Sequence, residues 1–280
     1  MSGIESLLDR IKHLIDSGTL ELPVFNETAA KLQSLNMDEG VDTDEVEKLI
    51  LADQVLAAEV LRAANSAFFC GLTEIHTVRK AIIRLGVQQV SRLVLLASHR
   101  SKYDARDPEL RRMAQTLWSH SSATAMAAGW VVRRLGFGNL LEAEAFLGGL
   151  LHDVGKLVII RAIDEIKLKN APYDLSAHLM EEILETAHPE LGFSFLKHRD
   201  VPDVYCEIAR DHHLKDFDPT KIALVSVRLA NSVAAKVGLS FRPDPSVVPS
   251  ALPEAQCLNA SAILLAELEI MLEDSFVPAS

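Results

Sequence analysis

Apolar residues recur at helical spacing along almost the whole chain, and this feature limits the range of folds more than any other. Spacing of i, i+3, i+4 and i+7 places side chains on one face of an α-helix, whereas a half-buried strand alternates apolar and polar residues. We find no run of strict alternation with hairpin signals. Examples of the helical stripes are Leu56, Val60, Ala63 and Ala64; Val78, Ala81, Ile82 and Leu85; and Val87, Val90, Val94 and Ala97. The sequence therefore predicts an all-α fold.

A charged, proline-containing segment, Lys102–Pro108, is typical of a connection between two lobes. A longer helix is predicted after it, from Glu109 to Arg134. We therefore expect an N-terminal helical lobe over residues 1–108 and a second helical lobe with a C-terminal helical extension over residues 109–280. Pro189 and Pro202 predict two later helix starts, because proline suits the first helical turn.

Composition narrows the classes of function. The chain has 28 basic and 39 acidic residues, and its net charge of −11 disfavours binding to nucleic acid or to an anionic membrane. Three scattered cysteines indicate neither a disulfide framework nor a zinc finger, so we expect a reducing cytoplasm. The N-terminus lacks the pattern of a signal peptide. His152, Asp153 and Lys156 interrupt the most apolar region, residues 143–160, so no membrane span is expected.

The stretch Leu150–Leu157 (LLHDVGKL) carries the strongest chemical signal, because His152 and Asp153 lie inside an otherwise apolar segment. If residues 141–154 are helical, His152 ends an apolar stripe and points inward. Other polar residues at inward or adjoining positions of predicted helices are His120, His188, His212, His213 and Asn231. His188 is expected at the N-cap of the helix that Pro189 would begin. We expect the five histidines and Asp153 to converge in one interior pocket.

Such a cluster has two explanations. Buried imidazoles and a carboxylate are costly unless they pair with one another or bind a cation. Imidazole and carboxylate together are good ligands for Zn, Fe, Ni or Mn. A dry hydrogen-bond network, as a relic of a metal site, would satisfy the same groups, and the residues themselves leave both readings open.

The arrangement of His120, the pair His152-Asp153 and a distant polar Asn231 resembles that of the HD-domain metal-dependent phosphohydrolases. His188 in the stretch HPELG and the pair His212-His213 resemble the additional ligands of the HD-GYP cyclic-di-GMP phosphodiesterases.

Two stretches of the first half decide between these relatives. ADQVLAAEVLRAANSAFF, residues 52–69, and IHTVRKAIIRLGVQQVSRLVLL, residues 75–96, are closely similar to the HDOD domain, the HD-related output domain of bacterial signalling proteins. The resemblance covers roughly residues 22–214. It implies an HD-like helical bundle with an N-terminal helical lobe, in a cytoplasmic bacterial protein with a regulatory, generally non-catalytic role.

The sequence differs from the catalytic relatives in ways that affect how many metal ions it can bind. Asn231 replaces the final aspartate, the GYP signature is missing, and Thr116 stands where a carboxylate often precedes the first histidine. Two divalent cations would bring four positive charges against the single negative charge of Asp153, which a low-dielectric interior tolerates badly. We therefore expect one divalent ion (Fe, Mn, Zn or Ni) or none, and no organic cofactor. The candidate metal ligands are His120, His152, Asp153, His188, His212, His213 and Asn231.

The leading interpretation is a signalling module that binds a protein partner or a small nucleotide-like ligand. The alternative is a metal-dependent phosphohydrolase acting on a nucleotide or cyclic dinucleotide, in which Asp153 and Lys156 would be catalytic. Lys156 could equally cap a helix that stops at Gly155. A helix-turn-helix around Gly86 ranks third, because a solvated basic face explains its arginines as well. The sequence leaves the oligomeric state open.

Overall fold

The computed structural model describes residues 2–18, 20, 43–52, 54–66, 73–100, 103–168 and 177–276. Every regular element within these ranges is helical, so the predicted all-α fold is confirmed. The elements are α1 (Ser2–Asp16), α3 (Thr43–Leu51), α4 (Gln54–Ala64), α5 (Val78–Leu85), α6 (Val87–Arg100), α7 (Pro108–Arg134), α8 (Asn139–Leu151), α9 (Val154–Leu168), α10 (Ala177–Lys197), α11 (Asp203–Asp211), α12 (Ile222–Lys236), η1 (Pro249–Ala251), α13 (Pro253–Cys257) and α14 (Ala262–Phe276).

The chain forms two compact units. The smaller unit spans residues 22–102 and contains α3 to α6, and the larger one combines residues 1–21 with residues 103–277. The larger unit includes α1, which packs on α9 and α10, whereas the sequence placed residues 1–108 in one lobe. The units also divide at residues 102 and 103, a few residues before the predicted boundary. Leu7, Ile11 and Ile15 form the buried stripe of α1, which explains its attachment to the larger unit. The predicted boundary between a lobe of residues 1–108 and a lobe of residues 109–280 stays a prediction.

Within the smaller unit, α5 and α6 meet at Gly86, as the helical stripes predicted. Gly86 has a φ of 79°, a backbone conformation that suits glycine. Thr77 caps the start of α5 by accepting a hydrogen bond from the backbone N–H of Lys80 at 3.2 Å. These signals fix both ends of α5 and place the two helices in contact.

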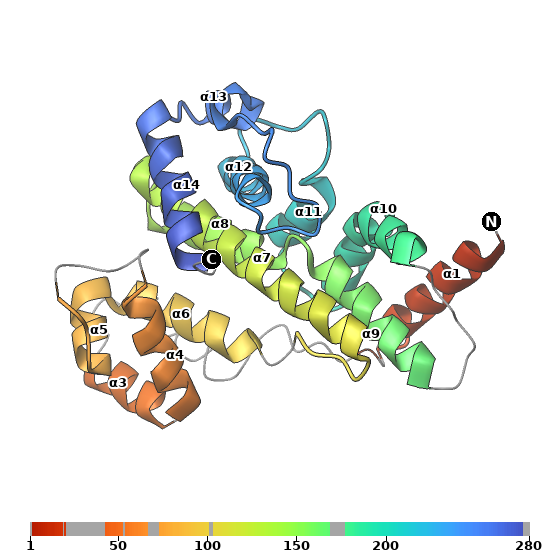
Figure 1. The fold of residues 1–280 in the computed structure, drawn as a ribbon, viewed down its shortest axis with the longest axis horizontal. Helices are drawn as coiled ribbons and strands as arrows, with labels where there is room; N and C mark the ends of the chain where they lie inside the picture. Colours follow the sequence, from red (N-terminus) through yellow and green to blue (C-terminus); the bar gives the residue numbers. More distant parts are fainter. Residues whose placement is uncertain are drawn as a thin grey trace. The chain divides into compact units, whose positions relative to one another are not determined.

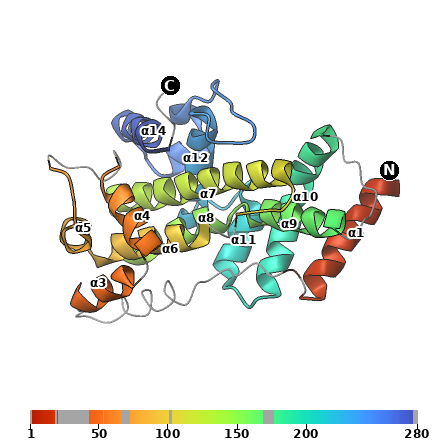
Figure 2. The ribbon, with the colours of Figure 1, turned by 60° about the horizontal axis from the view of Figure 1, so that its bottom comes forward.

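The core of the larger unit is built around α7, which lies alongside α8 and α12 (Figures 1 and 2). The helix begins at Pro108 after the N-cap Asp107, close to the predicted start, and ends at the predicted Arg134. Small residues allow α7 and α8 to approach closely. A Cβ atom added to Gly149 of α8 would lie 2.7 Å from the Cα of Ala125. This contact positions the two helices that carry His120 and His152.

Two predicted helix boundaries are wrong. Gly155 does not end a helix, because α8 stops at Leu151 and α9 begins at Val154. Pro189 does not begin one, because it lies inside α10, so His188 is not at an N-cap. In both cases the contact between α9 and α10 decides the local structure. Gly155 and Gly192 lie at this contact, with the backbones of the two helices touching.

Among the described helices, none combines the length and the apolar character that a membrane crossing requires.

Candidate metal centre

Five helices of the larger unit bring the histidines and Asp153 together. His120 lies in α7, His152 directly follows α8, Asp153 lies between α8 and α9, His188 lies in α10, and His212 directly follows α11. All five side chains are buried, with exposures of 3% or less. The structure therefore gathers groups that are far apart in the sequence, although their role as metal ligands stays a prediction.

The Nδ1 atom of each buried histidine lies within hydrogen-bond distance of a backbone carbonyl. The distances are 2.6 Å from His120 to Leu239 O, 2.7 Å from His152 to Gly149 O, 2.6 Å from His188 to Leu184 O and 3.0 Å from His212 to Ala209 O. A carbonyl oxygen only accepts hydrogen bonds, so each Nδ1 must carry the proton. In the neutral imidazole the other nitrogen, Nε2, then presents a lone pair.

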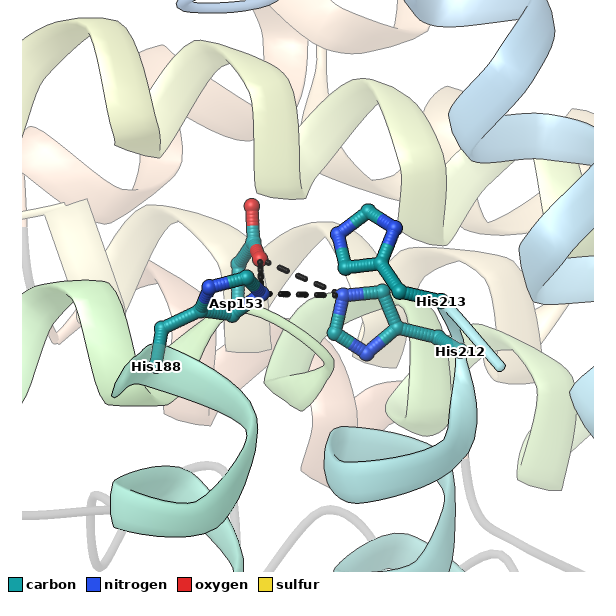
Figure 3. Close-up of side chains that lie close together, drawn as sticks. All are labelled: Asp153, His188, His212 and His213. Atoms are coloured by element: carbon teal, nitrogen blue, oxygen red, sulfur yellow. Dashed lines mark hydrogen bonds and ion pairs between the residues drawn. The ribbon is translucent and has the colours of Figure 1, made fainter. Parts of the chain in front are cut away.

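All four Nε2 atoms surround the Asp153 carboxylate. Oδ2 lies 3.4 Å from His120 Nε2 and 3.5 Å from His152 Nε2. Oδ1 lies 3.3 Å from His188 Nε2 and 3.5 Å from His212 Nε2, and Figure 3 shows this second group. The carboxylate therefore joins two histidine pairs, one at each oxygen.

Within each histidine pair, the lone pairs of the two Nε2 atoms repel each other unless a positive charge lies between them. His120 Nε2 is 3.1 Å from His152 Nε2, and His188 Nε2 is 3.3 Å from His212 Nε2. Oδ1 of Asp153 is buried and has no hydrogen-bond partner among the described residues, which is costly for a carboxylate oxygen. A metal cation would satisfy the oxygen and both imidazoles at once, and neutral imidazole with carboxylate is a suitable ligand set. The residues thus fit a divalent ion at Oδ1.

The pKa values support neutral imidazoles. Burial lowers the pKa of His188 to about 3 and lowers that of His152 well below its usual value. Burial alone would raise the pKa of Asp153, but the Lys156 ammonium and the surrounding histidines together outweigh it, so this pKa is held well below its usual value. The centre therefore combines an ionised carboxylate with imidazoles that are neutral at His152 and His188.

Lys156 is part of the centre. Its Nζ lies 2.9 Å from Asp153 Oδ2 and 3.7 Å from Glu185 Oε1, and the side chain is 7% exposed. The predicted helix-capping role is wrong, because Lys156 lies in the first turn of α9. The two carboxylate oxygens thus differ, since the ammonium group neutralises Oδ2 and leaves Oδ1 without a donor.

His213 and Asn231 differ from the buried group. His213 is exposed, contrary to the prediction of an inward position, although its ring lies 4.1 Å from that of His212 and within the second ligand group. The cause is that α11 ends at Asp211, so helical geometry does not continue to His213. Asn231 is half-buried in α12 and makes no side-chain hydrogen bond to any described residue. Its place as a metal ligand stays a prediction.

Sequence reasoning missed Glu185, which lies beside Lys156 and three residues before His188. The helical spacing i, i+3 could have placed Glu185 and His188 on one face. The assumption that Pro189 begins a helix concealed this relationship, because Glu185 would then have belonged to a preceding segment.

The fold and the site define an all-helical protein with a buried histidine–aspartate centre. The family model of the HDOD domain matches residues 22–215, so the chain belongs to the HDOD family, as the sequence motifs indicated.

The chain is also similar to an uncharacterized protein and to solved structures. An uncharacterized protein of Treponema pallidum (strain Nichols) is 22% identical over 198 residues, which make up 69% of this chain and 38% of that protein. The chain thus spans well under two thirds of that relative. An HDOD domain protein of unknown function from Geobacter sulfurreducens has 23% identity and a TM-score of 0.70, over 98% of this chain and 100% of that one. A candidate metal-dependent phosphohydrolase from Shewanella amazonensis SB2B has 17% identity and a TM-score of 0.71, over 99% and 100%. At these identities the structures show a shared fold.

Proposed function

We propose that this chain is a regulatory HDOD module that holds one divalent metal ion in the buried centre. It acts by binding a protein partner or a small nucleotide-like ligand, in a cytoplasmic setting. The observation that carries the proposal is the convergence of four histidine Nε2 atoms on one buried carboxylate. Such a set is stable when a cation supplies the missing positive charge.

The charges favour one ion. Asp153 contributes one negative charge and Lys156 one positive charge, and imidazoles add none when they bind a metal as neutral ligands. Lys156 already neutralises Oδ2, so the place for the ion is at Oδ1, where Asp153, His188 and His212 would hold it with His213 close by. A second ion would add two positive charges to an interior with no further buried carboxylate within these ligand groups.

The alternative is a metal-dependent phosphohydrolase, an activity that the name of the Shewanella protein suggests for that relative. Here a bound metal would supply Lewis-acid polarisation of a phosphoryl oxygen, and Lys156 would hold a phosphate. Two observations disfavour this function. The ligands are buried, and Lys156 is occupied by Asp153 and Glu185. We therefore rank regulation above hydrolysis.

Elemental analysis of the purified full chain, loaded with Mn or Zn and desalted, tests the metal site. We expect about one equivalent in the parent, none in Asp153→Asn, and about one in the control Asp164→Asn. Asp164 is also a buried carboxylate, but it accepts the backbone N–H groups of Arg106 and Asp107 at 2.9 and 3.0 Å. A parent that retains no metal and shows no metal-induced rise in melting temperature would contradict the proposal.

Turnover of bis-p-nitrophenyl phosphate by the Mn- or Fe-loaded protein separates regulation from hydrolysis. We expect no multiple turnovers. Multiple turnovers that Asp153→Asn abolishes and Asp164→Asn preserves would establish the alternative function instead.

A further inference from the structure

The family match ends at residue 215, yet residues beyond it contact two histidines of the centre. The carbonyl of Leu239 accepts the Nδ1–H of His120 at 2.6 Å. The guanidinium of Arg228 donates to the carbonyl of His212 at 2.8 Å. Helix α12 and the segment that follows it thus belong to the immediate surroundings of the centre.

Arg228 is held from several sides. Its NH1 donates to the carbonyls of Asp211 and His212 at 3.3 and 2.8 Å. Its Nε and NH2 lie 2.8 and 2.7 Å from Oε1 of Glu254 in α13. The guanidinium also lies 4.2 Å from the centre of the Phe217 ring. The side chains of Arg228 and Glu254 are only 10% and 5% exposed, so this arrangement is largely shielded from water.

The contacts of Arg228 with the backbone lie at the C-terminal end of α11. The last carbonyls of a helix lack partners within the helix, and a cation there complements the helix dipole. Arg228 satisfies the carbonyls where α11 ends, at the residues that lead into the pair His212-His213. When this backbone is held in place, the Cα atom from which the His212 side chain extends is held too. The Nδ1 of His212 is hydrogen-bonded to the carbonyl of Ala209 in the preceding turn.

We infer that Arg228, oriented by Glu254, is a positioning residue of the metal centre. It holds the end of α11 so that the Nε2 of His212 faces Asp153. The effect on metal affinity rests on the proposed function, whereas the effect on the His212 ring does not. The chain segment after the HDOD match is therefore required for the correct geometry of the centre.

A purely stabilising ion pair is the competing explanation. A buried ion pair often contributes little net stability, because desolvation offsets the attraction. The planar fork of arginine makes contacts in several directions that lysine cannot reproduce. We therefore expect the geometry of the centre to depend on the arginine fork and not only on its charge.

The test uses full-length Arg228→Met, Arg228→Lys and Glu254→Gln, with Lys236→Met as a matched control. Lys236 lies on the same helix and pairs with Glu269 of α14 at 2.6 Å, away from α11. Co²⁺ affinity and the Co²⁺ absorption spectrum report on the coordination, and ¹⁵N spectra of the histidine rings report on His212 in the metal-free protein. Melting temperatures report on the fold.

We expect the Arg228 and Glu254 variants to lose about 10-fold or more in Co²⁺ affinity, as is usual for groups that orient metal ligands, with an altered spectrum. The ring signals of His212 should shift in the same variants, while Lys236→Met changes only the melting temperature. If Arg228→Met fails to fold, Arg228→Lys and Glu254→Gln give the answer. Unchanged His212 signals and unchanged affinity in folded variants overturn the inference. A parent that binds no Co²⁺, but whose His212 signals shift in the Arg228 variants, refutes the metal proposal alone.

Discussion

Gly155 of α9 lies directly against the carbonyl group of His188 in α10. A Cβ atom at Gly155 would lie 1.9 Å from His188 O and 2.8 Å from the backbone nitrogen of Gly192. Only glycine permits this approach, because both nearby groups belong to the backbone. The contact brings Asp153 Oδ1 to 3.3 Å from His188 Nε2. The glycine in the HDVGK stretch thus serves the geometry of the centre.

Gly155→Ala should therefore destabilise the protein. The added methyl group has no room, and overpacking of this kind costs about 1–3 kcal/mol or more of unfolding free energy. Urea denaturation measures the loss. The control is Gly129→Ala, where the nearest neighbour of the new Cβ is a side-chain atom, Phe146 Cβ at 3.3 Å. Equal losses in both variants would show that the α9–α10 contact is no tighter than an ordinary helix contact.

Lys156→Met should strengthen the binding of the single metal ion. Removal of the ammonium group takes away a positive charge beside the Asp153 carboxylate that both ligand groups share. We expect the metal content to stay at about one ion per chain and the affinity for that ion to rise, because less positive charge opposes it. The metal-free variant should lose about 3–5 kcal/mol of stability, because a buried charge loses its partner.

Metal titration and denaturation measure both effects of Lys156→Met. The control is Lys167→Met, which breaks the pair with Asp107 at 2.8 Å on the same helix. An unchanged metal affinity would mean that the Lys156 ammonium does not oppose the ion.

Acid should destabilise the metal-free protein through its buried histidines. Burial lowers the pKa of His188 from 6.5 to about 3, so the native state keeps this ring neutral while the unfolded chain takes up a proton. The unfolded state then binds more protons, and stability is lost as the pH falls from about 6.5 toward 3. Each such histidine contributes about 1.4 kcal/mol per pH unit within this range. Asp153 adds to the loss only below its usual pKa of 3.8.

Chemical denaturation at pH 7, 6 and 5 in the presence of a chelator measures this slope. His188→Gln should reduce it by about 1.4 kcal/mol per pH unit, whereas His198→Gln, at an exposed position, serves as the control. An unchanged slope in His188→Gln would show that this histidine is already protonated in the native state.

The sequence predicted what depends on local periodicity. The stripes around His120 and His152 indicated helices with inward histidines, and the structure places both rings at the centre. The two stretches in residues 52–96 indicated the family, which the match over residues 22–215 confirms. Part of the first stretch, including residues 67–69, lies outside the described residues.

What the sequence could not predict depends on contacts between distant helices. Gly155 and Pro189 have local preferences for helix ends, but the packing of α9 against α10 keeps both inside helices. The Nδ1 bond of His120 depends on Leu239, which lies 119 residues away in the chain. The tautomer that leaves Nε2 with a free lone pair therefore follows from tertiary structure, which a pattern of residue types does not encode.

Asn231→Asp tests whether the last candidate ligand faces the centre. Asn231 follows Val227 by one turn of α12, and the Cγ2 of Val227 would lie 3.5 Å from a Cβ at Gly148, in the helix that leads to His152. A carboxylate at position 231 would add the negative charge that a hard cation favours. Because the residue is only half-buried, we expect the metal-free variant to lose about 1 kcal/mol, at the lower end for a charge placed near an apolar core.

With Mn or Zn present, Asn231→Asp should show a larger rise in melting temperature than the parent, because tighter binding to the native state stabilises it by mass action. Ser232→Asp is the matched control, since Ser232 is half-buried at the next position of α12 and points about 100° away. Melting curves with and without metal on the three proteins measure the effect. If Asn231→Asp gains no more from metal than Ser232→Asp does, Asn231 does not face the centre, and its assignment as the replaced aspartate of the HD arrangement is wrong.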